Sequence, residues 1–227
     1  MSFILAIRLT EILLGLAFLQ QSFEHIRAPK GERLIFIPRI FLSLLLVAGF
    51  QTQWVCIALF VLAVIMLQKF QGPYNGGSDR MGLLILTCLC AIHLLPAPQW
   101  QELAFGYLAI QLILSYFIAG WVKVRNPEWR TGQALQDVFT FSAYPVSQSV
   151  RAWANHPRLL RVMSWSVIMF ELAFPLALLT QTTLIIGLSI ATLFHLANAV
   201  LFGLNRFLWI WIAAYPSLWW LQNHVFH

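Results

Sequence analysis

Charged residues are scarce in this sequence: Asp, Glu, Lys and Arg make up 10% of its 227 residues, whereas an ordinary soluble domain has about 25%. Hydrophobic residues take their place and account for 60% of the chain. This composition excludes a water-soluble globular enzyme. It also excludes a disordered or low-complexity chain, which would be poor in apolar residues. We therefore expect an integral membrane protein with the lipid bilayer as its main partner.

Cysteine is also rare, with three residues at positions 56, 88 and 90. This number is too small for a disulfide framework. Cys88 and Cys90 are two residues apart and point in different directions on a helix, so they do not form a redox pair. All three lie in apolar stretches, where buried thiols usually pack as small hydrophobic groups. An HExxH motif and a tight Cys/His cluster are also lacking, so no metal site is predicted.

Long apolar stretches predict an all-α, polytopic membrane helix bundle that forms a single domain over residues 1–227. A membrane-spanning helix needs about 20 mostly apolar residues. We distinguish eight such spans, at about residues 2–22, 34–50, 53–69, 81–97, 102–122, 161–180, 182–203 and 206–222. The second and third spans are separated only by residues 51–53 and form a tight hairpin or one broken element.

The basic residues indicate the orientation of the bundle. Of the 14 Lys and Arg residues, all except Arg8 and Arg39 lie in, or directly at the edges of, the connections after the first, third, fifth and seventh spans. Basic residues collect on the cytoplasmic side, so we expect these connections inside and both termini outside, in a membrane such as the bacterial inner membrane. The formal net charge of +6 is then a topology signal, and no nucleic-acid partner is expected.

The longest connection, residues 123–160, mixes aromatic and aliphatic side chains with polar ones. Its apolar members include Phe139, Phe141, Tyr144, Val146, Val150 and Trp153. This mixture predicts a short amphipathic helix that lies at the membrane interface.

Several ionisable residues lie inside the predicted spans, where such groups are rare and mark candidate functional sites. Glu171 is about 15 Å into its span and His195 is at a similar depth on the next, antiparallel span, with Asn198 on the same face. Glu171 and His195 could meet as a pair that moves a proton or holds a ligand. Alternatively, an interhelical hydrogen bond between them only fixes the packing.

Three further groups have simpler explanations. Arg8 and Glu11 are three residues apart and can pair along one helix. Arg39 enters its span from the cytoplasmic side, where snorkelling explains it, although a guanidinium facing a ligand is an alternative. His93 is near the outer end of its span, where residence at the interface is sufficient.

The end of the fifth span carries a motif. Residues 116–135 read YFIAGWVKVRNPEWRTGQAL. Taken alone, Lys123 is either a charge that sets the topology or an amine that acts as a base once it leaves water.

This stretch resembles the Y-x-x-A-G-x-x-K and W-x-x-G-x-A-L signature of HTTM-domain proteins, the family of vitamin K-dependent gamma-carboxylase. Two other stretches extend the resemblance over about residues 70–210. ELAFP at 171–175 with FHLAN at 194–198 resembles the family's E-x-x-x-P and F-H pattern, and NGGSDRMGLL at 75–84 resembles a segment that opens a helix.

The resemblance implies a function. In the carboxylase, the lysine of this motif deprotonates vitamin K hydroquinone, so Lys123 would be the base of a carboxylase-like or quinone-linked enzyme. Glu171 and His195 would line the quinone pocket or relay protons. The expected cofactor-binding residues are Trp129, Asn198, Arg39 and Asp79. The alternative is a noncatalytic membrane subunit similar to DoxX or MauE proteins, which contacts a soluble redox partner on the cytoplasmic side through residues 123–160.

Overall fold

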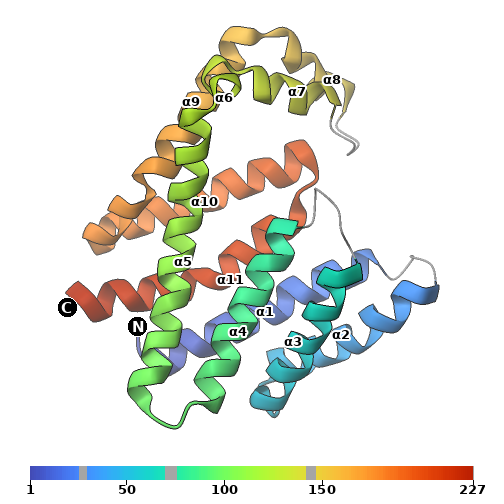
Figure 1. Ribbon diagram of the computed structural model, residues 1–227, viewed down its shortest axis with the longest axis vertical. Helices are drawn as coiled ribbons and strands as arrows, with labels where there is room; N and C mark the ends of the chain where they lie inside the picture. Colours follow the sequence, from blue (N-terminus) through green and yellow to red (C-terminus); the bar gives the residue numbers. More distant parts are fainter. Residues whose placement is uncertain (26–29, 70–75, 142–146, 227) are drawn as a thin grey trace. The chain divides into compact units, whose positions relative to one another are not determined.

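The computed structural model describes residues 1–25, 30–69, 76–141 and 147–226 and is shown in Figure 1. These residues form helices and no strand, so the predicted all-α class is confirmed. The chain divides into two compact units. One comprises Met1–Ile110 and Arg206–His227, and the other comprises Gln111–Asn205. The long helix α5 (Pro98–Arg125) contributes its first half to the first unit and its second half to the second unit.

The first unit is a bundle of long apolar helices. Besides the start of α5, it contains α1 (Phe3–Glu24), α2 (Lys30–Ala48), α3 (Thr52–Lys69), α4 (Gly76–Leu94) and α11 (Asn205–Phe226). Helix α1 packs against α2 and α4, and α3 packs against both α2 and α4. Fully buried leucines such as Leu14, Leu46 and Leu59 fill the space between them. Close packing of these side chains holds the bundle together.

The predicted hairpin between the second and third spans is confirmed. Helix α2 ends at Ala48 and α3 begins at Thr52. The turn takes two residues through the left-handed region, Gly49 at φ +77° and Gln51 at φ +47°. A left-handed residue directly after a helix ends it and reverses the chain.

The second unit joins two long helices through a set of short ones. After the end of α5 come α6 (Pro127–Thr131), α7 (Gln133–Phe141), α8 (Gln148–Arg151), the 3-10 helix η1 (Ala152–Asn155), α9 (Pro157–Ala173), the 3-10 helix η2 (Phe174–Leu179) and α10 (Gln181–Phe202). Helices α6 and α7 pack against α9, and η2 packs against α10. The short helices therefore form a cap on the start of α9.

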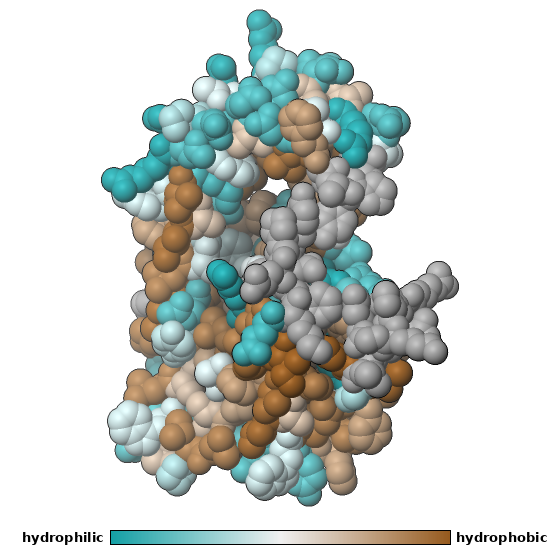
Figure 2. All heavy atoms as spheres, turned by 45° about the vertical axis from the view of Figure 1, so that its right-hand side comes forward, coloured by the Kyte–Doolittle hydropathy of each residue, from teal (hydrophilic) through white to brown (hydrophobic). Residues whose placement is uncertain are grey.

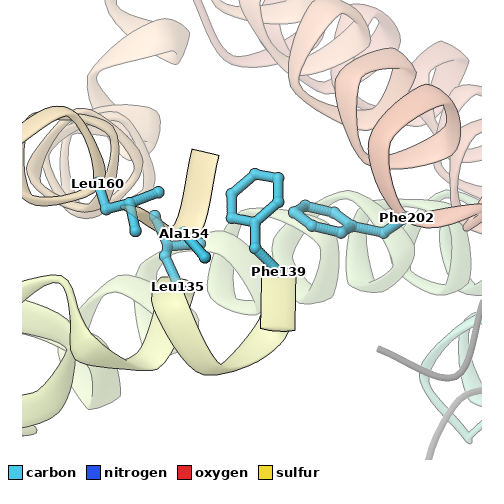
Figure 3. Packing of buried hydrophobic residues seen from close by; sticks show 5 residues of the cluster. All are labelled: Leu135, Phe139, Ala154, Leu160 and Phe202. Atoms are coloured by element: carbon cyan, nitrogen blue, oxygen red, sulfur yellow. The ribbon is translucent and has the colours of Figure 1, made fainter. Parts of the chain in front are cut away.

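A hydrophobic cluster anchors this cap. It consists of Leu135, Phe139, Ala154, Leu160 and Phe202, and Figure 3 shows the ring of Phe139 turned toward that of Phe202. Their ring centroids are 4.9 Å apart. Helix α7 lies within residues 123–160 and places Leu135 and Phe139 in this cluster, while Phe141 is exposed. Tyr144 and Val146 lie outside the described residues, and location at the membrane interface stays a prediction.

Five helices are long and apolar enough to cross a membrane, among the residues that the structure describes. They are Phe3–Glu24, Gly77–Leu94, Pro98–Arg125, Pro157–Leu179 and Gln181–Phe202. Two of the predicted spans correspond to shorter apolar helices, Ile35–Ala48 and Thr52–Gln68. The eighth corresponds to α11, whose four tryptophans, Tyr215 and Pro216 lower its mean hydropathy. Eight helices therefore occupy the predicted stretches, and five of them have the properties of membrane spans.

Large apolar side chains remain exposed along the long helices. Among those more than half exposed are Ile4, Phe41, Trp54, Leu103, Val162, Leu193 and Val200. Hydrophilic side chains, in contrast, gather over the short helices α6–α8 at the top of Figure 2. Extensive exposed apolar surface of this kind is suited to contact with lipid rather than water. The molecule is an integral protein of the lipid bilayer.

Candidate functional site

One face of α5 carries three residues of the sequence motif. Tyr116, Gly120 and Lys123 follow one another at spacings of four and three residues, so they form a stripe on the same side of the helix. The middle of the stripe is very close to α9. A Cβ atom built on Gly120 would lie 2.9 Å from Cβ of Glu171 and 2.9 Å from the backbone nitrogen of Leu172. Only glycine allows the two helices to approach so closely.

Lys123 and Glu171 form an ion pair at the C-terminal end of this stripe. The Nζ atom of Lys123 donates hydrogen bonds to both carboxylate oxygens of Glu171, at 2.6 Å each. The side chains are 18% and 4% exposed, so little water screens the pair. Nζ also lies 5.1 Å from the centroid of the Trp129 ring, in a cation–π arrangement. A cation, an anion and an aromatic face thus meet in one partly buried position.

Tyr116 and His195 form a second polar contact, two helical turns away from Lys123 along α5. The hydroxyl of Tyr116 is 2.8 Å from Nε2 of His195, and the tautomer of the histidine decides which group donates. Both residues are buried. The Tyr116 ring packs against Phe174 and Phe170, with centroid distances of 4.1 and 5.7 Å. The polar contact is therefore surrounded by aromatic rings.

The turn after α5 holds Trp129 in place. Asn126 caps α6 by accepting a hydrogen bond from the backbone nitrogen of Glu128 at 2.9 Å, and Gly132 ends α6 in the left-handed conformation at φ +88°. The hydroxyl of Ser164 on α9 donates to the carbonyl of Trp129. Because these contacts attach the turn to α9, the Trp129 ring stays beside Lys123. The structure thus explains the roles of Trp129 and Gly132 in the motif: Gly132 ends α6, and the turn holds Trp129 beside Lys123.

Pro175 ends the regular part of α9, whose last residue is Ala173, two residues after Glu171. Proline has no N–H, so the carbonyl of Glu171, four residues earlier, receives no helical hydrogen bond from it. The chain continues as the 3-10 helix η2. Beside η2 is a groove of about 300 Å³, lined by Phe170, Phe174 and Ile186 among other residues, and Thr183 is the polar member of its lining. Two residues of this groove, Phe170 and Phe174, are the rings that pack against Tyr116.

The other predicted binding residues lie elsewhere. Asn198 is half-buried on α10, and its backbone carbonyl accepts a hydrogen bond from the backbone nitrogen of Leu204 at 3.3 Å. Arg39 and Asp79 belong to the first unit and are joined by Gln21. Nη2 of Arg39 donates to Oε1 of Gln21 at 2.8 Å, and Nε2 of Gln21 donates to Oδ1 of Asp79 at 3.0 Å.

The snorkelling interpretation of Arg39 was wrong. Arg39 is 4% exposed, and its guanidinium lies over the ring of Phe18 at 4.1 Å from the centroid. The charge stays inside because Gln21 accepts its hydrogen bond and Phe18 offers an aromatic face. The polar chain from Arg39 to Asp79 links α1, α2 and α4.

Glu171 and His195 were predicted to lie at similar depths and to meet, either as a functional pair or as a packing hydrogen bond. The structure gives each a partner from α5: Lys123 for Glu171, and Tyr116 for His195. The role of Tyr116 was missed, although its spacing to Gly120 and Lys123 already places all three on one helix face. The expected ion pair between Arg8 and Glu11 is confirmed, with 2.8 Å between Nη1 and Oε2.

Comparison with known proteins identifies the family. The family model described as the HTTM domain matches residues 91–220, which is more than half of the chain and includes α5 and the whole second unit. No curated protein and no solved structure matches the chain. The matched region contains Tyr116, Lys123, Glu171 and His195. Together with the motif along α5, the match shows that this membrane protein belongs to the HTTM-domain family.

Proposed function

We propose that the second unit binds a quinone-like lipid and that Lys123 acts as the base toward it, with Glu171 as the proton acceptor for Lys123. The ion pair between Lys123 and Glu171 is the observation that carries this proposal. A buried ion pair adds little to stability, because apolar residues of similar size often serve equally well. A functional reason for keeping both charges is therefore the better explanation.

The pair has a direct route for a proton. Transfer from Nζ of Lys123 to a Glu171 oxygen, along a hydrogen bond of 2.6 Å, leaves a neutral amine and a carboxylic acid. The amine can then accept a proton from an acidic hydroxyl of the ligand, which is general base catalysis. When bound, a hydroquinone would supply two such hydroxyl groups and two electrons. The Tyr116–His195 contact offers a second donor or acceptor for the ligand's other oxygen.

The groove beside η2 fits the ring of such a ligand. Its volume of about 300 Å³ is at the lower end of ligand-binding cavities, and aromatic residues Phe170 and Phe174 line it. Ile186 and Leu176 on its rim are exposed, so an isoprenoid tail could remain in the bilayer. If the protein is an enzyme, this arrangement supports quinone-linked redox chemistry or a carboxylase-like reaction.

Binding of a menaquinone-type ligand to the purified full chain in detergent tests the proposal. We expect Lys123→Ala and Glu171→Gln each to weaken binding by tenfold or more, which is about 1.4 kcal/mol. Arg125→Ala is the matched control, because Arg125 is a basic residue at the same helix end but is exposed. A second matched pair compares Tyr116→Phe with Tyr107→Phe, since Tyr107 is on the same helix and 52% exposed.

The proposal would be contradicted if the wild type did not bind the ligand, or if the test and control variants lost affinity for it equally. The second candidate function would then lead, namely a noncatalytic membrane subunit that contacts a soluble redox partner. It is favoured by the exposed arginines Arg130, Arg158 and Arg161 on the second unit. Site-specific crosslinking from position 158 to an anionic redox protein would support it.

A further inference from the structure

Three potential metal ligands come together in the first unit, far from one another in the sequence. They are Glu11 on α1, Cys56 on α3 and His93 on α4, and their ligand atoms all lie within 4.8 Å of one another. Oε1 of Glu11 and Nε2 of His93 are 2.7 Å apart. Glu11 and Cys56 are 3% and 0% exposed, respectively. The cluster therefore offers an oxygen, a sulfur and a nitrogen in a largely buried position.

We propose that this cluster binds one zinc ion. Zinc accepts carboxylate, thiolate and imidazole ligands together in a tetrahedral site. In a tetrahedral zinc site the bonds are about 2.0–2.3 Å long, so neighbouring ligand atoms are roughly 3.3–3.6 Å apart. To reach this geometry, Oε1 of Glu11 and Nε2 of His93, now 2.7 Å apart, would move slightly apart and the Cys56 sulfur would move closer. Cys56 then releases its thiol proton to solvent as the ion binds.

Arg8 fixes the carboxylate in the orientation that such a site requires. Its Nη1 atom donates to Oε2 of Glu11 at 2.8 Å and to the carbonyl of Leu46 at 2.8 Å. Nη2 donates to the carbonyl of Val47, also at the end of α2. One oxygen of Glu11 is thus held by Arg8 while Oε1 faces His93. Carboxylates that ligate metals are commonly oriented by hydrogen bonds of this kind.

A cavity next to the cluster provides access and a fourth position. It has a volume of about 450 Å³ and is lined by Arg8, Glu11, Thr52, His93 and Gln101, among others. Three protein ligands with one open position are typical of catalytic zinc sites, whereas structural sites are closed by four. The charges of Glu11 and Cys56 would balance those of the ion. Arg8 then remains as a positive group at the cavity and favours hydroxide or another anion as the fourth ligand.

The location of the cluster indicates from which side the metal arrives. Cys56 is close to the start of α3 and His93 is close to the end of α4. The nearby connections, residues 49–51 and 95–97, carry no Lys or Arg. The distribution of basic residues predicts that this end of the bundle faces outward. The site would therefore take up zinc from outside the cell rather than from the cytoplasm.

Metal titration of the purified full chain in detergent tests the proposal. The protein is stripped with a chelator and titrated with Zn²⁺ in competition with a chromogenic chelator. We expect the wild type to bind one ion per chain, and Cys56→Ala and His93→Gln to bind at least about tenfold more weakly. Cys88→Ala is the matched control, because Cys88 is also buried, at 3% exposure, but lies outside the cluster. It should bind zinc like the wild type.

The Co²⁺-loaded wild type gives a readout that does not depend on any variant folding correctly. A thiolate-to-cobalt charge-transfer band is expected if Cys56 ligates the ion. The proposal is overturned if this band is missing or if the wild type does not bind one zinc ion per chain. It is also overturned if Cys88→Ala loses as much affinity for zinc as Cys56→Ala does. In those cases Glu11, His93 and Arg8 form a hydrogen-bond network and nothing more. The proposed quinone site is in the other unit, so neither outcome affects it.

Discussion

Replacing Gly120 with alanine tests whether α5 and α9 are as close as the site requires. The new methyl group would lie 2.9 Å from Cβ of Glu171, 2.9 Å from the backbone nitrogen of Leu172 and 3.1 Å from its Cγ. Backbone atoms cannot move aside as a flexible side chain can, so we expect an overpacking cost of about 1–3 kcal/mol. Alanine also favours the helix over glycine by about 0.8–1.0 kcal/mol, which hides part of this cost.

Gly106→Ala is the matched control, because Gly106 is also in α5 and the helix-propensity gain is the same. Its new methyl group would meet Trp220 at 3.8 Å and Leu221 at 4.0 Å, which are ordinary contacts. The propensity gain cancels between the two variants. We therefore expect Gly120→Ala to be less stable than Gly106→Ala by the overpacking cost alone, about 1–3 kcal/mol.

Thermal unfolding in detergent, followed by tryptophan fluorescence, measures this difference. One kcal/mol corresponds to about 2–4 °C in Tm for a chain of this size, so Gly120→Ala should unfold at least about 2 °C below Gly106→Ala. Equal melting temperatures would refute the close approach of α5 and α9. A drop in Gly120→Ala should also be accompanied by loss of ligand binding, since the methyl group displaces Glu171 from Lys123.

Three other predictions follow from the packing and the charges. Phe139→Ala should lower the free energy of unfolding by about 3–5 kcal/mol, because Phe139 is fully buried. Phe141→Ala is the control: Phe141 is 77% exposed, so this variant should stay within about 0.5 kcal/mol of the wild type. Similar losses of stability in the two variants would place the apolar side of α7 outside the cluster. Lys123→Met leaves the buried carboxylate of Glu171 without its cation and should lower the free energy of unfolding by about 3–5 kcal/mol. Adding Glu171→Leu should restore most of this stability, whereas additive losses of stability in a double-mutant cycle would argue against the pair. The basic connections predict that the C-terminus lies outside the cell. In a bacterial host, an alkaline phosphatase fused to the C-terminus should therefore be active, and a fluorescent protein fused there should not fluoresce. The opposite pattern would show that the predicted orientation is wrong.

The sequence predicted the elements of the fold well because apolar stretches and basic connections are local signals. The stretch from 206 to 222 was correctly placed in a helix, α11, although its tryptophans reduce its apolar character. The break of α9 at Pro175 was missed. The signal was present in the sequence, since proline inside a helix removes a hydrogen bond, but the apolar character of residues 161–180 concealed it.

The candidate site was predicted in part, and the reason lies in the distance between its members along the chain. Lys123, Glu171 and His195 were identified one by one, because ionisable groups in or beside a membrane span are energetically costly and because of the family resemblance. Their partners depend on how α5 meets α9 and α10, which no local pattern specifies. The same holds for Cys56 and His93, which were interpreted as a packing thiol and an interfacial histidine until the fold placed them beside Glu11.

The stripe on α5 explains the spacing of Tyr116, Gly120 and Lys123 in this sequence. A tyrosine, a glycine and a lysine at positions i, i+4 and i+7 lie along one face of a helix. The glycine in the middle lets α9 approach within a distance that any side chain would prevent. This approach brings Glu171 within 2.6 Å of Lys123 and Phe174 within 4.1 Å of Tyr116, between ring centroids. Gly120 therefore holds both polar contacts in place by keeping α5 and α9 close together. A substitution of Gly120 should disturb the contacts at both ends of the stripe, whereas a substitution of Lys123 or Tyr116 should disturb only the contact that this residue makes.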